Sequence, residues 1–512
     1  MNRRELIKLG TGAMCNLPAV AAGLAEAANT STVAHPDTNL LIEQWGTYEL
    51  ILHGPSGGNP FLDVHVIGRF RIDHRTIDVP GFYDGDGIYR IRYMPDSPGE
   101  WTCETRSNSP SLDGKAARFT CTPTTRGNHG PVQVTDRYHF EHADGTPFFP
   151  FGTTCYAWAF MGSPYEEETI DILRTAPFNK VRMCLLPKPL GRSLFALPFP
   201  RSATGINDFS RFNPEYFQHI EQRVQDLLRL NIQADLILFH PYDEWGYKSM
   251  PPEVNDRYLR YVVARFSAYR NIWWSLANEY DFIRSKTTAD WDHYFRIVQE
   301  SDPSSHLRSI HNGAVVYDNS KPWVTHASLQ RFAFDKTAEW RSAWNKPIIF
   351  DEMQYEGDIP SRWGNLSPEE MTRRFWMAVI SGAYASHGET YMSNADQPVW
   401  SNGGLLRGTS PARIGFLRNL LEGSTDVGLN QQVDSYYYSA NQPGQLYLWY
   451  FDYHRPAQYD FPLPDDTTFT AEWIDPWNMS VHSIPGKHRG KTTIKLPHEP
   501  YMAVRFKKVT QE

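Results

Sequence analysis

The segment NIWWSLANEYDF, residues 271–282, joins a short apolar run to an abrupt change into polar side chains. The run at 271–276 carries two tryptophans and predicts a fully buried strand. Asn278 and Glu279 follow it directly. A carboxylate at the end of a buried strand costs free energy unless it is paired or used. Glu279 is therefore a candidate functional residue.

A second segment of the same kind lies later in the chain. The apolar run at 346–350, KPIIF, is followed by Asp351 and Glu352. Two buried strands that each end in a glutamate indicate a parallel barrel with its site at the carboxyl face. Because side chains alternate along a strand, we expect Asp351 to face out of the barrel and Glu352 to face the site. Two carboxylates are what hydrolysis of a glycosidic bond requires.

Between these segments and around them, short apolar runs alternate with helical patterns. Such alternation is typical of βα units, and eight units predict a (β/α)8 barrel, or TIM barrel, of the α/β class. We place the barrel at residues 131–425. The expected strands are Phe148–Thr153, Phe178–Leu186, Ile232–Phe239, Asn271–Leu276, Leu307–His311, Trp323–His326, Pro347–Phe350 and Gly388–Met392.

Antiparallel strand patterns flank the barrel on both sides. Residues 33–123 and 430–512 contain short alternating runs with turn residues between them. Each region predicts an antiparallel β-sandwich domain. Such a domain either binds carbohydrate or packs on the catalytic domain, and the second role is the more common. A small hairpin at 139–145 is expected to cap the barrel floor.

The first 28 residues have the features of an export signal peptide. A basic start, a moderately apolar middle and the sequence AEA at 25–27 match a secretory leader. Arg3 and Arg4 resemble a twin-arginine signal, with a general secretory leader as the alternative. Met14 stands before Cys15 where a lipoprotein signal has a small residue, so no lipid anchor is expected. A periplasmic or secreted location follows.

Composition narrows the class of partner. The 512 residues carry a net charge of −8 without a basic cluster, which argues against nucleic acid and anionic membranes. Beyond the leader, no run reaches the roughly 20 apolar residues of a membrane helix. Aromatic residues make up 14% of the chain and include 16 tryptophans, which suits both β-rich cores and sugar-stacking surfaces.

Four cysteines lie beyond the leader. Cys103 and Cys121 lie in neighbouring predicted strands, which leaves a disulfide between them open. Cys155 and Cys184 lie near successive barrel strands without metal-ligand spacing, so we expect free buried thiols there.

The two glutamate segments carry a resemblance to a known family. WSLANEYD at 274–281 and PIIFDEMQYEGDIPSRWGN at 347–365 resemble the bacterial apiosidase-like glycoside hydrolases. Their clan carries its acid/base and its nucleophile on barrel strands 4 and 7, and β-domains flank the barrel. The resemblance implies Glu279 as acid/base, Glu352 as nucleophile, Asn278 as the partner of a sugar 2-hydroxyl, and Arg182 beneath the nucleophile. No cofactor is implied.

Three histidines, His240, His311 and His326, each follow a predicted strand. We assign them to substrate hydrogen bonds or to support of the glutamates, with a metal site as the minor alternative. Glu356 lies four residues after Glu352 and is expected to line the pocket or to pair with a base. Aromatic residues in the predicted mouth loops are candidates for sugar stacking or loop packing: Trp158, Trp245, Tyr355, Tyr391 and Trp400.

These observations predict an exported retaining glycoside hydrolase that acts on a carbohydrate. Resemblance suggests side chains of plant polysaccharides, and a bacterial polysaccharide or oligosaccharide remains open. Because the insertion at 187–211 would wall the pocket, we expect exo action, on a β-linkage. The alternatives are a non-catalytic carbohydrate-binding protein on the same scaffold, a transglycosylase that uses the same residues, and a metal-dependent hydrolase.

Overall fold

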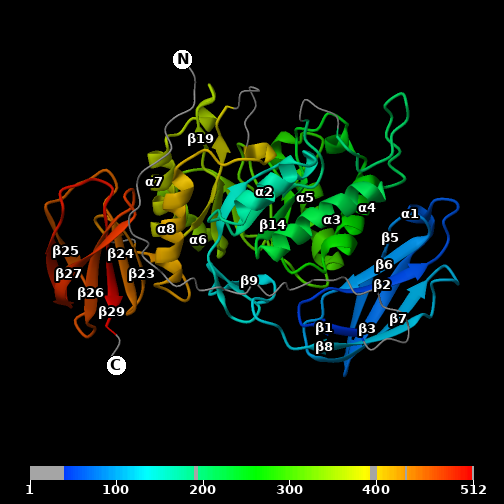
Figure 1. The fold of residues 1–512 in the computed structure, drawn as a ribbon, viewed down its shortest axis with the longest axis horizontal. Helices are drawn as coiled ribbons and strands as arrows, with labels where there is room; N and C mark the ends of the chain where they lie inside the picture. Colours follow the sequence, from blue (N-terminus) through cyan, green and yellow to red (C-terminus); the bar gives the residue numbers. More distant parts are fainter. Residues whose placement is uncertain (1–39, 190–193, 393–399, 433–434, 510–512) are drawn as a thin grey trace, which may run out of the picture.

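The structure is a computed structural model that describes residues 40–189, 194–392, 400–432 and 435–509. Three parts lie in a row in Figure 1: an N-terminal β-domain in blue, a central barrel in cyan to yellow, and a C-terminal β-domain in orange and red. The predicted fold class, a (β/α)8 barrel between two β-domains, is confirmed. The predicted export signal at 1–28 lies outside the described residues.

The N-terminal domain consists of two sheets packed face to face. Their strand orders are β1-β8-β7-β3-β4 and β2-β6-β5. Tyr48 stacks on Phe119 between the sheets, and Trp101 is fully buried beside them. The elements are β1 Leu40–Glu43, β2 Tyr48–His53, α1 Pro60–Asp63, β3 Val66–Ile72, β4 Arg75–Pro80, β5 Phe82–Tyr83, β6 Ile88–Tyr93, β7 Gly99–Ser107 and β8 Ala116–Thr122.

The barrel is an eight-stranded parallel sheet in the order β16-β15-β14-β13-β12-β20-β18-β17. A parallel bridge between His311 and Ser328 joins the two ends and closes the barrel. The strands are β12 Phe151–Thr154, β13 Lys180–Cys184, β14 Gln233–Phe239, β15 Ile272–Ala277, β16 Arg308–Ser309, β17 Ala327–Gln330, β18 Ile348–Glu352 and β20 Tyr384–His387.

Helices cover the outside of the barrel. Four of them, α3, α4, α7 and α8, carry proline in the first turn, where the missing N–H leaves no hydrogen bond unmade. The helices are α2 Tyr165–Leu173, α3 Pro214–Arg229, α4 Pro252–Phe266, α5 Thr288–Ser301, α6 Thr337–Trp344, α7 Pro368–Ile380 and α8 Ser410–Glu422. Residues 310–326, all described, connect β16 to β17 without a helix.

Two barrel strands lie elsewhere than predicted. The sixth strand is β17 at 327–330, not 323–326, and the eighth is β20 at 384–387, not 388–392. Both strands carry a polar residue that faces into the barrel, Ser328 and Ser386, and this hides their apolar pattern. Part of the expected eighth strand is instead β21, Glu389–Thr390, which pairs with β19, Glu356–Gly357.

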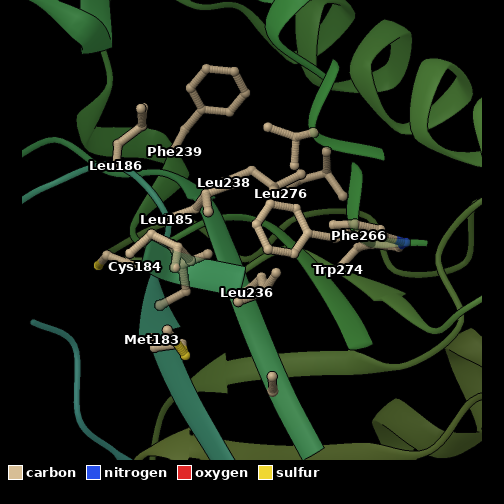
Figure 2. Packing of buried hydrophobic residues seen from close by; sticks show 14 of the residues in the cluster. Met183, Cys184, Leu185, Leu186, Leu236, Leu238, Phe239, Phe266, Trp274 and Leu276 are labelled. Carbon is tan, nitrogen blue, oxygen red and sulfur yellow. The ribbon is translucent and has the colours of Figure 1, made fainter. Parts of the chain in front are cut away.

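The core of the barrel wall lies between the strands and their helices. Figure 2 shows Leu236 and Leu238 of β14, Trp274 and Leu276 of β15, and Phe266 of α4 packed together. These side chains are at most 1% exposed and exclude water from the wall. Burying each large apolar side chain contributes about 1.5–3 kcal/mol.

The barrel floor is closed by a small antiparallel sheet, as predicted. It consists of β9 Val132–Thr135, β10 His139–His142 and β11 Pro147–Phe148. Phe140 packs on Trp273, with ring centroids 5.3 Å apart, and also contacts Tyr384. The open end of the barrel is therefore the one at the carboxyl ends of the strands.

A buried charge network joins the N-terminal domain to the barrel. Arg92 of β6 contacts Glu221 of α3, and Arg265 of α4 lies 3.0 Å from Glu221 and 2.7 Å from Asp84. The full set is Glu49, Asp84 and Glu221 with Arg90, Arg92 and Arg265, three charges of each sign. Removal of one member would leave a buried charge unpaired, at a cost of about 3–5 kcal/mol.

The C-terminal domain packs on α7 and α8. Trp376 of α7 stacks on Tyr450, and Arg373 pairs with Asp452 at 2.5 Å. The strand orders are β22-β23-β24-β29-β26-β27 and β25-β28. The strands are β22 Asn430–Gln431, β23 Tyr438–Gln442, β24 Leu446–Tyr450, β25 Gln458–Pro462, β26 Phe469–Asp475, β27 Ser480–His488, β28 Lys491–Lys495 and β29 Ala503–Lys508.

The four described cysteines are free and buried. Cys103 and Cys121 lie on the paired strands β7 and β8, but Cys103 stands opposite Ala117 and Cys121 opposite Gly99. This register separates the two sulfurs, so the disulfide that the sequence left open is not formed. Among the described helices, none is long and apolar enough to cross a membrane.

Candidate active site

A ladder of charged side chains fills the barrel below its mouth. Lys180 Nζ lies 2.8 Å from Asp235 and 2.7 Å from Asp351, and Arg182 Nε lies 3.5 Å from Asp235. None of these side chains is more than 1% exposed. Burial is compensated because the two cations face two carboxylates.

Asp351 faces into the barrel, so the prediction that it faces outward is wrong. Its carboxylate pairs with Lys180 and accepts a hydrogen bond from Ser328 at 2.6 Å. The register of β17 against β18 shifts between Leu329 and Gln330, which places an extra residue at the end of β18. Such a bulge breaks the alternation of side chains and re-aims the next one. Glu352 therefore reaches the site although Asp351 also faces inward.

Glu352 is surrounded by donors and positive charge. Its Oε1 accepts a hydrogen bond from the Tyr156 hydroxyl and lies 3.4 Å from His311 Nε2 and 3.7 Å from Arg182 Nη1. Burial would raise the pKa of Glu352, but His311, Arg182 and Tyr156 outweigh it and lower the pKa to about 2. Glu352 is a carboxylate at neutral pH.

Glu279 has the opposite surroundings. It is 7% exposed, and its Oε2 has no hydrogen-bond partner among the described residues. Burial and the charge of Glu352 raise the pKa of Glu279 to about 7, against smaller opposing effects of Gln330 and Lys188. Glu279 also has a left-handed backbone, with φ of 45°, a conformation that costs free energy and clusters at functional sites.

Arg182 connects the two strand ends. Its Nη2 donates to Asn278 Oδ1 at 3.2 Å, while Nη1 lies 3.7 Å from Glu352. One guanidinium thus orients the residue before the proposed acid and holds the charge of the proposed nucleophile. The predicted position of Arg182, beneath Glu352 at the barrel mouth, agrees with these contacts.

The three histidines divide between different places. His311 lies beside Glu352, and its Nδ1 is 3.0 Å from the Ser328 hydroxyl. Both ring nitrogens of His240 bind backbone: Nε2 donates to the Leu186 carbonyl at 2.9 Å and Nδ1 accepts from Tyr242 N–H. His240 therefore holds two mouth loops together, and its predicted bond to substrate is wrong.

His326 lies in the barrel floor, so its predicted place at the mouth is wrong. It precedes β17, and its ring packs on Phe140 and Trp273 with centroids 5.8 and 5.1 Å away. Burial lowers its pKa to about 3. The three histidines do not form a metal site. Among the described residues, side chains arranged to hold a metal occur at Glu356, His387 and Glu389.

Of the aromatic candidates, Tyr355 belongs to the site. Its hydroxyl lies 3.1 Å from that of Tyr156, which contacts Glu352. Trp158 and Trp400 are fully buried in the wall behind β12, and Trp400 donates to Thr153 at 2.8 Å. Neither tryptophan presents a face to a sugar, so their predicted role in binding is wrong.

Two further aromatic candidates have protein partners. Trp245 stacks on Tyr247 with ring centroids 6.0 Å apart. Tyr391 is half-buried and donates to Glu356 Oε1 at 2.9 Å. Glu356 itself is fully buried, and its carboxylate also accepts from Thr409 N–H and the Ser410 hydroxyl. Glu356 therefore anchors the start of α8, and its predicted place as a lining of the pocket is wrong.

Known sequence families and structures match this arrangement. A family model described as the apiosidase-like catalytic domain matches residues 134–407, more than half of the chain. The chain belongs to the apiosidase-like family. Models of two domains of unknown function, DUF5060 and DUF5605, match residues 41–108 and 434–507. A search of curated protein sequences found no match.

Solved structures resemble this apiosidase-like protein over most of its length. A candidate glycoside hydrolase from Bacteroides vulgatus is 36% identical, with a TM-score of 0.87, over 92% of this chain and 100% of the other. A glycoside hydrolase family 5 protein from the same organism is 15% identical, with a TM-score of 0.58, over 74% and 94% of the chains. The second likeness is one of fold.

Two site residues of this apiosidase-like protein were missed in the sequence. Tyr156 comes two residues after β12, and Lys188 comes four residues after β13. Lys188 Nζ lies 4.8 Å from the ring centroids of both Tyr156 and Tyr242. Position after a barrel strand, the signal that identified Glu279, was also present for Tyr156. Lys188 lies in a long insertion and carried no such signal.

Proposed function

We propose that this protein is a retaining glycoside hydrolase with Glu279 as acid/base and Glu352 as nucleophile. The observation that carries the proposal is the contrast between the two glutamates at one end of the barrel. Their surroundings move the pKa of Glu279 up to about 7 and the pKa of Glu352 down to about 2. A protonated acid beside an ionised nucleophile is what the first step of retention needs.

In the first step, the Glu352 carboxylate attacks the anomeric carbon of the bound sugar. The bond from that carbon to the leaving oxygen breaks, and Glu279 transfers its proton to this oxygen. In the second step, the Glu279 carboxylate takes a proton from a water molecule. The water oxygen bonds to the anomeric carbon, and Glu352 leaves as a carboxylate. Every residue returns to its starting state, without a cofactor.

The expected substrate is a terminal β-linked sugar on a polysaccharide or oligosaccharide. Exo action requires a closed pocket, and the insertion after β13 supports one. Phe199 in this insertion is buried against Phe212 and Tyr247, with ring centroids 5.3 and 5.6 Å away. This packing holds the described part of the insertion, residues 194–211, in place and supports its role as a wall beside the mouth. Family membership supports side chains of plant polysaccharides as the source of the sugar.

Export is part of the proposal and rests on the leader sequence. Replacement of Arg3 and Arg4 with lysine should leave the precursor in the cytoplasm if the twin-arginine route is used. Cell fractionation and immunoblotting of the two forms measure this. Unchanged export would assign the leader to the general secretory route.

A panel of aryl glycosides and polysaccharides tests the function directly. We expect release of one monosaccharide with retained anomeric configuration. Proton NMR of the freshly released product measures this configuration. The Glu352→Gln variant, of nearly the same shape, is the control and should release nothing. Formation of larger products at high sugar concentration would indicate transglycosylation. Binding without turnover by the wild type would support the non-catalytic alternative and contradict the proposal.

A further inference from the structure

A second cluster of ionisable groups lies outside the active site, behind strand β20. Ser386 faces into the barrel, so its neighbour His387 faces outward, toward the helix layer. Glu356 of β19 and Glu389 of β21 lie beside it on two paired strands. The three side chains are at most 2% exposed, and one ligand atom from each lies within 4.8 Å of the others.

Within the part of the chain that the structure describes, no lysine or arginine balances the two carboxylates of this cluster. Among the described residues, neither Glu356 nor Glu389 forms an ion pair with a lysine or arginine. The Glu389 carboxylate accepts hydrogen bonds from the backbone N–H groups of Arg407 and Gly408, at 2.6 and 2.9 Å. The start of α8 contributes only about half a positive charge. Buried charges are normally paired or coordinated to a metal ion.

His387 supplies a free nitrogen at the same point. Its Nδ1 lies 3.2 Å from the Thr153 hydroxyl, which also accepts a hydrogen bond from Trp400 at 2.8 Å. Its Nε2 lies 3.9 Å from Glu356 Oε2 and has no hydrogen-bond partner among the described residues. This unpartnered nitrogen is therefore available to a ligand beside the Glu356 carboxylate.

We propose that Glu356, His387 and Glu389 bind one divalent transition-metal ion. A neutral imidazole with two carboxylates is a ligand set that Zn²⁺, Mn²⁺ or Fe²⁺ accepts, whereas Ca²⁺ and Mg²⁺ prefer oxygen alone. The Thr153 hydroxyl fixes the other ring nitrogen, as supporting groups do around metal-bound histidines. The ion would balance the charge of both carboxylates.

The neighbours of the cluster show what the ion would do. Glu356 contacts Thr409 and Ser410 at the start of α8, and Glu389 holds the preceding loop. Because the cluster is closed and lies behind β20, the ion has a structural role: it fixes α8 and the β19 segment to the barrel.

The test uses tag-free, full-length protein that has been treated with a chelator and dialysed. Elemental analysis before treatment should find about one divalent transition-metal ion per chain. Titration of the treated protein with ZnCl2 or MnCl2 should show one site by calorimetry and raise Tm by at least about 3 °C. The proposal would be overturned if elemental analysis finds no metal in the untreated protein and titration leaves Tm unchanged.

Two matched histidine variants separate this site from binding at the other histidines of the chain. His387→Gln removes the proposed ligand, whereas His326→Gln removes an equally buried neutral imidazole from the barrel floor. We expect His387→Gln to bind the metal ion at least about 100-fold more weakly than the wild type. His326→Gln should bind the ion with the affinity of the wild type. Equal binding by both variants would contradict the proposal. If His387→Gln does not fold, X-ray absorption spectroscopy of the cobalt-loaded wild type tests the site instead. We expect one imidazole ligand on the cobalt ion, and a spectrum without an imidazole ligand would contradict the proposal.

Discussion

The ends of strands β15 and β18 carry the same side chain in opposite surroundings. Glu352 at the end of β18 contacts Tyr156, His311 and Arg182, and these hold its charge. Glu279 after β15 has an oxygen without a partner among the described residues and keeps its proton to near neutral pH. In the proposed mechanism, the neighbours of each glutamate, rather than its position after a barrel strand, decide whether it acts as acid or as nucleophile.

The largest expected effect is at the β18 end. Glu352→Ala should reduce turnover by about 10⁴-fold or more on every substrate, because no leaving group removes the need for a nucleophile. Steady-state assays on substrates with good and poor leaving groups measure this. Glu369→Ala, at an exposed position on α7, is the control and should retain full activity. A substrate that the Glu352 variant still hydrolyses at the wild-type rate would refute the assignment.

At the β15 end, the effect should depend on the leaving group. With a sugar hydroxyl as the leaving group, which needs protonation, Glu279→Ala should lower the rate of hydrolysis by about 10²–10⁴-fold. With dinitrophenolate the first step needs little acid, so glycosyl-enzyme should form and then stall. Added azide should restore turnover and give a glycosyl azide of retained configuration. Rescue of Glu352→Ala in place of Glu279→Ala, with retained configuration, would exchange the two roles.

The groups that hold the charge of Glu352 should give intermediate effects. Arg182→Lys removes the guanidinium group that reaches both Asn278 and Glu352. Tyr156→Phe removes the hydroxyl that donates a hydrogen bond to Glu352. A hydrogen bond to a charged group is worth about 1.5–3 kcal/mol, so each change should reduce kcat/KM roughly 10–100-fold. Tyr156→Phe should also raise the pKa of Glu352 and move the acidic limb of the pH profile upward. An unchanged acidic limb in this variant would mean that the Tyr156 hydroxyl does not stabilise the carboxylate.

The smallest expected effect is at Lys188. Its positive charge lowers the pKa of Glu279, against the larger effect of burial. Lys188→Met should therefore raise the pKa of Glu279 and extend activity toward higher pH, with little change at the optimum. Lys188→Arg keeps the charge and should behave as the wild type. A shift of the basic limb toward lower pH in Lys188→Met would mean that the Lys188 ammonium group does not lower the pKa of Glu279.

The fold and the two glutamates could be predicted because buried strands and their polar ends are local features of the sequence. β17 and β20 were misplaced because Ser328 and Ser386 face an internal charge network that no local pattern reports. The direction of Asp351 depended on a bulge between two strands that are joined only in three dimensions.

The supporting residues needed the tertiary structure for the same reason. His326 was assigned to the mouth because the sixth strand was placed four residues too early. Glu356 was assigned to the pocket because nothing near it in the sequence shows that α8, more than 50 residues later, begins against its carboxylate. Tyr156 contacts Glu352 across almost 200 residues of sequence.

The pH dependence of kcat/KM on an aryl glycoside that the wild type hydrolyses tests the central contrast most directly. Glu352 must be ionised and Glu279 protonated, so activity should fall as pH rises through about 7 and should stay high down to low pH. In Glu279→Ala, the rate of the first step with a dinitrophenyl glycoside should no longer decrease as pH rises through about 7. Persistence of that fall in Glu279→Ala would contradict the assignment of Glu279 as the acid.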